Sequence, residues 1–191
     1  MVKQSMASAG KPAIFLDRDG VLVIPTFRDG RSFAPTSLEN FVIYPEARAC
    51  LDRLKGAGFL LVVVTNQPDV GNGVVERAVV DEMHRRLRVA LPLDSVKVCF
   101  HRQDENCACR KPKPYLLLEA AREMNIELSA SVIIGDRVSD IEAGRSAGCR
   151  TIHIDWGYTA EPAPKDVDIV ATSLTEATDR LLTPQREMAT R

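Results

Sequence analysis

An apolar run that stops at two carboxylates constrains this chain more than any other feature. Residues 13–16 are Ala-Ile-Phe-Leu, and Asp17, Asp19 and Gly20 follow closely. A short, continuous apolar run predicts a strand buried in a parallel sheet, and such sheets bind ligands at the carboxyl ends of their strands. Two carboxylates this close favour a divalent cation such as Mg²⁺, beside which one could attack a phosphoryl group while the other transfers protons. The alternative is a strand end with two solvated aspartates.

A second apolar run, at residues 59–64, ends in Thr65, Asn66 and Gln67. One hydroxyl and two amides at the end of a buried strand are placed to donate hydrogen bonds to an anion bound near Asp17. We therefore expect Thr65 at the reacting group and Asn66 and Gln67 at the substrate. Polar residues also end many strands that carry no site.

A further run, at residues 131–135, ends at Asp136, and Asp140 follows four residues later at the start of a predicted helix. The first carboxylate could reach a cation. The second could brace a neighbouring side chain such as a lysine, or it could cap the helix.

Four potential metal ligands lie within eleven residues: Cys99, His101, Cys107 and Cys109. Three thiolates and one imidazole complete a tetrahedral set for zinc, which is typical of a structural site. The alternatives are free cysteines beside a chance histidine, or a redox pair. We expect a zinc-clipped loop.

The basic sequence Arg110-Lys111-Pro112-Lys113-Pro114 follows this loop directly. A rigidly held lysine can neutralise a phosphate, and an arginine can bind a second anionic or hydroxylated part of a substrate. A solvated charge run is the alternative, although cations at a helix start oppose the helix dipole.

Strands and helices alternate along the chain, which predicts an α/β fold with a doubly wound, Rossmann-like, mostly parallel sheet and helices on both faces. We expect residues 1–12 to be loosely ordered, residues 13–183 to form one domain and residues 184–191 to be a frayed tail. Residues 25–40 are interpreted as a long loop that either covers the substrate or has no role. His84, inside a predicted helix at 75–90, is interpreted as a surface residue.

Charge and hydropathy exclude several classes of protein. The net charge of −1 offers no general attraction to nucleic acid or to anionic membranes. No apolar stretch has the length of a signal peptide core or a membrane span. We expect a cytoplasmic monomer that binds neither nucleic acid nor membrane.

Taken together, the four strand-end motifs resemble those of the haloacid dehalogenase-like phosphatase superfamily. The resemblance implies that Asp17 is a nucleophile that forms an aspartyl-phosphate and that Asp19 is the general acid and base. It also implies that Thr65 and Lys111, rather than Lys113, hold the phosphoryl group. Mg²⁺ would be bound by Asp17, by the backbone carbonyl of Asp19 and by Asp136.

Within the superfamily, Asp-Arg-Asp-Gly, Thr-Asn-Gln, the zinc clip and Arg-Lys-Pro resemble the branch of the D-glycero-D-manno-heptose 1,7-bisphosphate phosphatases and the histidinol-phosphate phosphatases. The branch implies that Arg110 contacts the substrate beyond its reacting phosphate, and we also place Arg137 at the substrate. The intervals between motifs are too short for a separate cap domain. The chain departs from the heptose phosphatases in four places: Val23, residues 25–40, Asn72-Gly73 and Tyr115-Leu116.

Three functions follow as hypotheses. The first is a Mg²⁺-dependent phosphatase of a small phosphorylated metabolite, such as heptose 1,7-bisphosphate or a related sugar phosphate. The second is a histidinol-phosphate phosphatase. The third, from another class, is a catalytically idle, zinc-stabilised module that binds a phosphosugar.

Overall fold

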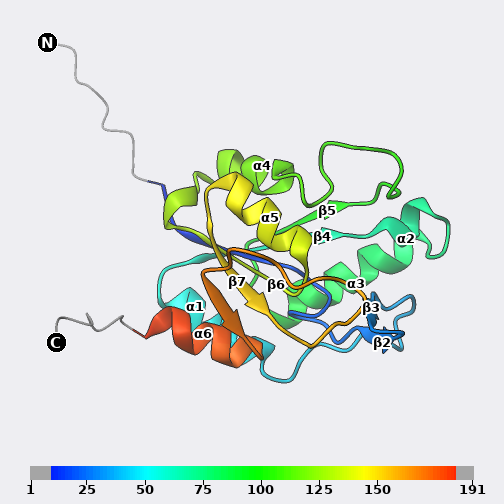
Figure 1. The fold of residues 1–191 in the computed structure, drawn as a ribbon, viewed down its shortest axis with the longest axis horizontal. Coiled ribbons are helices and arrows are strands. Elements are labelled where there is room, and N and C mark those ends of the chain that lie inside the picture. The colour runs from blue at the N-terminus through cyan, green and yellow to red at the C-terminus, as the bar shows by residue number, and fades with distance from the viewer. Residues whose placement is uncertain (1–9, 184–191) are drawn as a thin grey trace, which may run out of the picture.

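A six-stranded parallel sheet forms the centre of the molecule (Figure 1). The computed structural model describes residues 10–183. The strand order is β5-β4-β1-β6-β7-β8, with bounds Ser95–Cys99, Leu60–Asn66, Ala13–Leu16, Val132–Gly135, Arg150–Ile154 and Ile169–Ala171. In the centre of the sheet, Phe15 of β1 pairs with Val62 of β4 and with Ile133 of β6. The doubly wound fold predicted from the sequence is confirmed.

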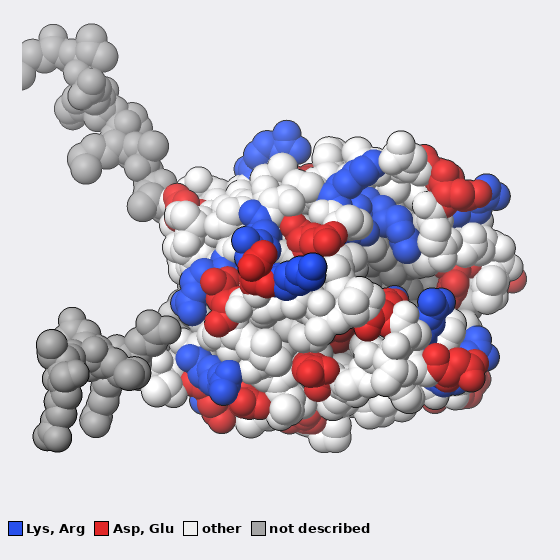
Figure 2. Space-filling view, in the orientation of Figure 1, with Lys and Arg blue, Asp and Glu red and all other residues white. Residues whose placement is uncertain are grey.

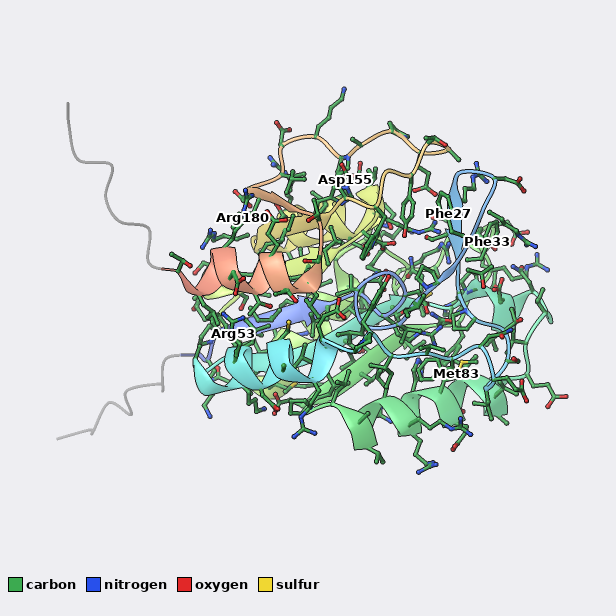
Figure 3. All side chains as sticks on the ribbon, turned by 90° about the horizontal axis from the view of Figure 1, so that it is seen from below. Phe27, Phe33, Arg53, Met83, Asp155 and Arg180 are labelled. Carbon is green, nitrogen blue, oxygen red and sulfur yellow. The ribbon has the colours of Figure 1, made fainter. Side chains whose placement is uncertain are left out.

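Helices cover both faces of this sheet. Successive residues of β1 point to opposite faces and all four are buried, so both faces must be covered. Ile14 and Leu16 face α1 (Ala47–Gly56), α3 (Arg77–Ala90) and α6 (Leu174–Leu182). Ala13 and Phe15 face α4 (Tyr115–Met124) and α5 (Val138–Ala147). Figure 3 shows the first face, with Arg53 on α1, Met83 on α3 and Arg180 on α6. Two short elements complete the fold: α2 (Pro68–Gly71) and a 3-10 turn (Leu128–Ala130).

The segment expected to be a long loop contains a β-hairpin, so the loop prediction is wrong for residues 26–33. Strands β2 (Thr26–Arg28) and β3 (Arg31–Phe33) pair antiparallel around Asp29 and Gly30. Both turn residues have positive φ, 51° and 74°, as a two-residue type I′ turn requires. A Cβ on Gly30 would lie 2.3 Å from Thr159 Oγ1, so glycine is also needed where the hairpin meets residues 159–160.

The prediction that His84 lies on the surface is wrong. His84 is buried in α3, and its Nε2 lies 3.1 Å from Nη1 of the fully buried Arg18. Alternation along β1 turns Arg18 away from the sheet edge that Asp17 occupies, toward the side of the sheet that α3 covers. Burial and the nearby Arg18 lower the pKa of His84 to about 3, so this imidazole is neutral.

Residues 10–12, which the sequence led us to expect as loosely ordered, are attached to the fold. Lys11 exchanges backbone hydrogen bonds with Asn125 and Glu127, both of 2.9 Å, so residues 10–12 are tied to the end of α4. The other residues expected to be loosely ordered or frayed, 1–9 and 184–191, lie outside the described part. Within residues 10–183, no helix is both long and apolar enough to cross a bilayer.

The packing on α4 can be tested with two neighbouring leucines. Leu117 is fully buried between α4 and the sheet, whereas Leu118 is 36% exposed. We expect Leu117→Ala to lower the free energy of unfolding by about 2–5 kcal/mol, because it removes buried methyl groups and leaves a cavity. Leu118→Ala on the same helix should cost at most about 1 kcal/mol. Urea unfolding of both variants measures the difference, and equal losses would contradict the packing described here.

Candidate active site

The site lies between β1 and β6, where the order in which the chain adds strands to the sheet reverses. From β1 the chain passes to β4 and β5 on one side, and it then crosses back to β6 on the other side of β1. Connections leave β1 and β6 in opposite directions, and in open α/β sheets the crevice at such a point binds the ligand. Asp17 follows β1 and Asp136 follows β6, so the reversal brings both carboxylates to this crevice.

Lys111 is buried between two of these carboxylates. Its Nζ lies 2.9 Å from Oδ1 of Asp17 and 2.5 Å from Oδ1 of Asp140, and it donates a 2.7 Å hydrogen bond to the carbonyl of Val64. Burial alone would lower the pKa of Lys111, but Asp140 and Asp17 raise it above its usual value. The lysine is therefore a fixed cation beside Asp17. Lys113 instead donates to Asn106 and to the carbonyl of Cys107, outside this contact.

Asp140 makes both contacts that the sequence left as alternatives. Its Oδ1 pairs with Lys111, and its Oδ2 accepts a 3.1 Å hydrogen bond from the backbone N–H of Arg137 at the start of α5. Gly135 allows this close approach, because a Cβ there would lie 2.2 Å from the Cβ of Asp140. Burial raises the pKa of Asp140 to about 6, although Lys111 opposes this shift.

Asp19 is held by two side chains that point away from the cleft. Arg18 donates to it through Nη2 at 2.9 Å and through Nε at 3.1 Å. Gln67 donates to Oδ2 of Asp19 at 2.8 Å and to Oγ1 of Thr65 at 2.9 Å, and its own carbonyl accepts from Arg18. Gln67 is buried in these contacts and does not line the cleft, contrary to the expectation that it contacts substrate.

Two other residues expected at the substrate line the cleft and also hold its walls. Asn66 makes paired 3.1 Å hydrogen bonds with the backbone N–H and C=O of Lys111. Arg137 donates to the carbonyl and hydroxyl of Ser32 on β3, and it pairs with Glu161 at 3.1 Å. Asn66 thereby fixes the lysine loop, and Arg137 fixes the hairpin.

The carboxylates fit a divalent cation. Ligand oxygens of Asp17, Asp136 and Asp140 all lie within 4.8 Å of one another. Tyr158 donates to Oδ2 of Asp136, while Oδ1 of Asp136 is buried and has no hydrogen-bond partner within residues 10–183. Burial, Asp17 and Asp140 raise the pKa of Asp136 well above its usual range, so the group needs a cation to stay ionised. Gly20 leaves room for the carboxylate of Asp136, because a Cβ there would lie 2.1 Å from its Oδ2.

The cysteine and histidine cluster has the dimensions of a tetrahedral site. Cys107 Sγ lies 3.6 Å from Cys99 Sγ and 3.7 Å from Cys109 Sγ. His101 Nδ1 lies 3.6 Å from Cys99 Sγ and 3.2 Å from Cys109 Sγ. Zinc bound to sulfur at about 2.3 Å requires sulfur atoms about 3.8 Å apart in a tetrahedron. Four donors at these separations fit a closed, structural zinc site.

A cleft of about 600 Å³ opens beside Asp17, Asp19 and Lys111. Its walls come from the hairpin, the start of α5 and the loop between β5 and α4, and Figure 1 shows these segments at one end of the sheet. In Figure 2 the cleft is the hollow with basic side chains near both of its margins. Arg110 lines it beside Lys111.

Sequence reasoning missed Arg18, His84 and Tyr158 as members of the site. Arg18 could have been found from strand alternation, since it lies between two aspartates that must face the cleft. Tyr158 has only its place in a loop after β7 as a signal, and its contact with Asp136 depends on how that loop folds back.

Several known proteins resemble this chain in sequence. The HAD-hydrolase-like family model matches residues 108–177. A D-glycero-beta-D-manno-heptose-1,7-bisphosphate 7-phosphatase of Pseudomonas aeruginosa is 32% identical over 149 residues, which cover 75% of this chain and 81% of that protein. The D-glycero-alpha-D-manno-heptose-1,7-bisphosphate 7-phosphatase of Mycobacterium tuberculosis is 34% identical over 166 residues, covering 81% of this chain and 85% of that protein.

A solved structure of a heptose bisphosphate phosphatase has the same fold as this chain. The D,D-heptose 1,7-bisphosphate phosphatase of Bordetella bronchiseptica, complexed with magnesium and phosphate, superposes with a TM-score of 0.77. It is 27% identical and covers 90% of this chain and 98% of its own. The sequence relatives, the shared fold and the strand-end motifs agree, and the chain belongs to the haloacid dehalogenase-like hydrolases, in the family of the heptose 1,7-bisphosphate phosphatases.

Proposed function

We propose that this chain is a Mg²⁺-dependent phosphatase that hydrolyses D-glycero-D-manno-heptose 1,7-bisphosphate or a related sugar phosphate through an aspartyl-phosphate. The observation that carries the proposal is the buried contact of Asp17 with Lys111, beside the unpaired oxygen of Asp136. This arrangement provides a carboxylate nucleophile, a fixed cation and a metal ligand at one edge of the sheet. The heptose phosphatases described above are its relatives.

The proposed reaction has two steps, formation and hydrolysis of an aspartyl-phosphate. A carboxylate oxygen of Asp17 attacks phosphorus, and the bond from phosphorus to the substrate oxygen breaks. Asp19 gives its proton to that leaving oxygen, then takes a proton from the water that attacks the aspartyl-phosphate, which releases phosphate and restores Asp17. Lys111 and the hydroxyl of Thr65 stabilise negative charge on the phosphoryl oxygens throughout.

Asp17, the backbone carbonyl of Asp19 and Asp136 would hold Mg²⁺ in this proposal. When bound, the ion neutralises charge on the phosphoryl group and on the carboxylates. Asp140 is a supporting residue whether or not Mg²⁺ is bound, since it positions Lys111.

The four donors at Cys99, His101, Cys107 and Cys109 would hold a structural zinc. Their loop ends directly before Arg110 and Lys111, so the zinc would limit the positions that both cations can take. In the proposal this metal takes no part in the chemistry.

The relatives favour a heptose phosphate over histidinol phosphate, since both sequence relatives described above are named for heptose 1,7-bisphosphate. A module that only binds a phosphosugar would not need Asp17, Asp19, Lys111 and Asp136 together. We therefore propose small phosphorylated sugars as its substrates. We also propose that it acts as a monomeric metabolic enzyme of the cytoplasm.

Removing the nucleophile tests the chemistry. We expect Asp17→Asn to lower phosphate release from heptose 1,7-bisphosphate by roughly three orders of magnitude or more, because the amide is a poor nucleophile. Circular dichroism should show the fold retained. Asp52→Asn, at a half-exposed position on α1, is the matched control and should keep full activity. Activity retained by Asp17→Asn would refute the assigned nucleophile.

Chelation tests the divalent cation. Phosphate release should stop when EDTA removes free Mg²⁺, since Asp17 and Asp136 need the ion to share the site. It should return when excess Mg²⁺ is added together with one equivalent of Zn²⁺, because EDTA also removes metal from the proposed zinc site. Asp136→Asn should raise the Mg²⁺ concentration that gives half-maximal activity. Unchanged turnover in EDTA would contradict a role for a divalent cation in the reaction.

Metal analysis tests the structural zinc. Protein purified without chelator should contain about one equivalent of zinc, and Cys109→Ser should lose the metal and unfold at lower urea concentrations. Cys50→Ser, whose sulfur contacts Thr175 outside the cluster, should keep the zinc. Less than half an equivalent of zinc in a folded protein would count against the site.

A further inference from the structure

We propose that the β2–β3 hairpin gives the cleft a second anion-binding site, in which Arg31 acts with Arg110 to select substrates that carry a second anionic group. The inference rests on the proposed phosphatase function and deepens it, because it adds a specificity residue from a hairpin in the segment expected to be a long loop. Arg31 and Arg110 come from different walls of the same cleft.

Arg31 is a cation that has no counter-ion in the described part of the chain. Across the turn it pairs directly with Arg28, and two like charges placed opposite each other destabilise a hairpin. Arg28 is accommodated by the ring of Phe33, whose centroid lies 4.3 Å from the guanidinium carbon. The side chain of Arg31 is exposed, and it makes no hydrogen bond or ion pair with any residue between 10 and 183. An anion in the cleft would relieve the repulsion and pair this charge.

Arg110 has an unmet hydrogen-bonding capacity in the same cleft. Its Nη1 is buried and has no partner among the described residues. A buried guanidinium nitrogen without an acceptor is costly, so the position points to a ligand that supplies one. Its neighbour Lys111 is held by Asn66 through the backbone, which fixes the start of the Arg110 side chain close to the reacting centre.

Three contacts hold the hairpin in place, so Arg31 is presented on a fixed support. The carbonyl of Gly30 accepts hydrogen bonds from Thr159 and Ala160, each of 3.2 Å. Phe27 stacks on Tyr158 with ring centroids 5.7 Å apart, and Ser32 accepts from Arg137. Phe27 and Phe33 are labelled on the hairpin in Figure 3. A guanidinium held on such a support loses less conformational freedom when it binds an anion.

The rest of the lining suits a phosphorylated polyol. Asp69 and Glu142 also face the cleft, and carboxylates of this kind accept hydrogen bonds from sugar hydroxyls. Glu161 is already paired with Arg137 and leaves Arg31 free. The ligand class is therefore a polyhydroxylated compound with one phosphate at Asp17 and a second phosphate at the two arginines.

Substrate pairs separate this second site from the catalytic centre. Steady-state kinetics would compare heptose 1,7-bisphosphate, as either anomer, with heptose 7-phosphate, which lacks the second phosphate. We expect Arg31→Met to raise KM for the bisphosphate by about 10- to 100-fold, because a charge-assisted contact is lost, and to leave kcat and all constants for the monophosphate nearly unchanged. Arg31→Lys should recover part of the loss. Arg28→Met, on the same hairpin and with the same change of charge, is the matched control and should behave like wild type.

Calorimetric titration of heptose 1,7-bisphosphate into Asp17→Asn and into Asp17→Asn/Arg31→Met makes the test independent of turnover. Weaker binding by the double variant supports the second site even if another phosphate ester proves to be the better substrate. Equal binding overturns it, as do equal losses for both substrates or an Arg28→Met effect as large as that of Arg31→Met. Failure of the wild-type protein to release phosphate from any phosphate ester would overturn the proposed function and leave the titration to decide the anion site.

Discussion

One buried ammonium group holds the proposed catalytic edge together. Lys111 lies between Asp17 and Asp140 and is itself fixed by the carbonyl of Val64. Without it, carboxylates delivered by β1 and β6 would meet at the reversal of the sheet with no compensating charge, in a region from which water is largely excluded. The lysine balances part of this charge, and the unpaired oxygen of Asp136 remains for a divalent cation. The clustered carboxylates repel one another unless cations lie between them, and the same cations would bind a phosphoryl group beside Asp17.

The loops around this edge act through their attachments. On one wall, Asn66 grips the backbone of Lys111, and the proposed zinc site at residues 99–109 fixes the chain just before Arg110. On the other wall, Arg137 binds the hairpin through Ser32. The first loop would position groups for the reacting phosphate, and the hairpin would position Arg31 for the rest of the substrate. Chemistry and specificity can then vary separately, because they depend on different segments.

Much of the fold could be predicted because its signals are local. The buried strands are continuous apolar runs, and the runs predicted at residues 13–16, 59–64 and 131–135 form the three central strands β1, β4 and β6. The errors have tertiary causes. His84 lies among charged neighbours in the sequence, and its burial depends on a contact with the buried Arg18, which follows the distant strand β1. The hairpin strands have three residues each, too few to show alternation, although Asp29-Gly30 was a readable turn signal. The choice of Lys111 over Lys113 came from a family resemblance, because their places in the sequence are too similar to separate them.

The central claim is that Asp17 becomes phosphorylated during turnover, and trapping that intermediate tests it most directly. Protein mixed with Mg²⁺ and heptose 1,7-bisphosphate would be quenched with borohydride, which reduces an aspartyl-phosphate to homoserine, and the peptide containing residue 17 would be sequenced by mass spectrometry. We expect homoserine at position 17 only when both substrate and Mg²⁺ are present. Reduction at Asp19 or Asp136 instead, or none in a protein that is turning over substrate, would contradict the assignment of Asp17 as the nucleophile.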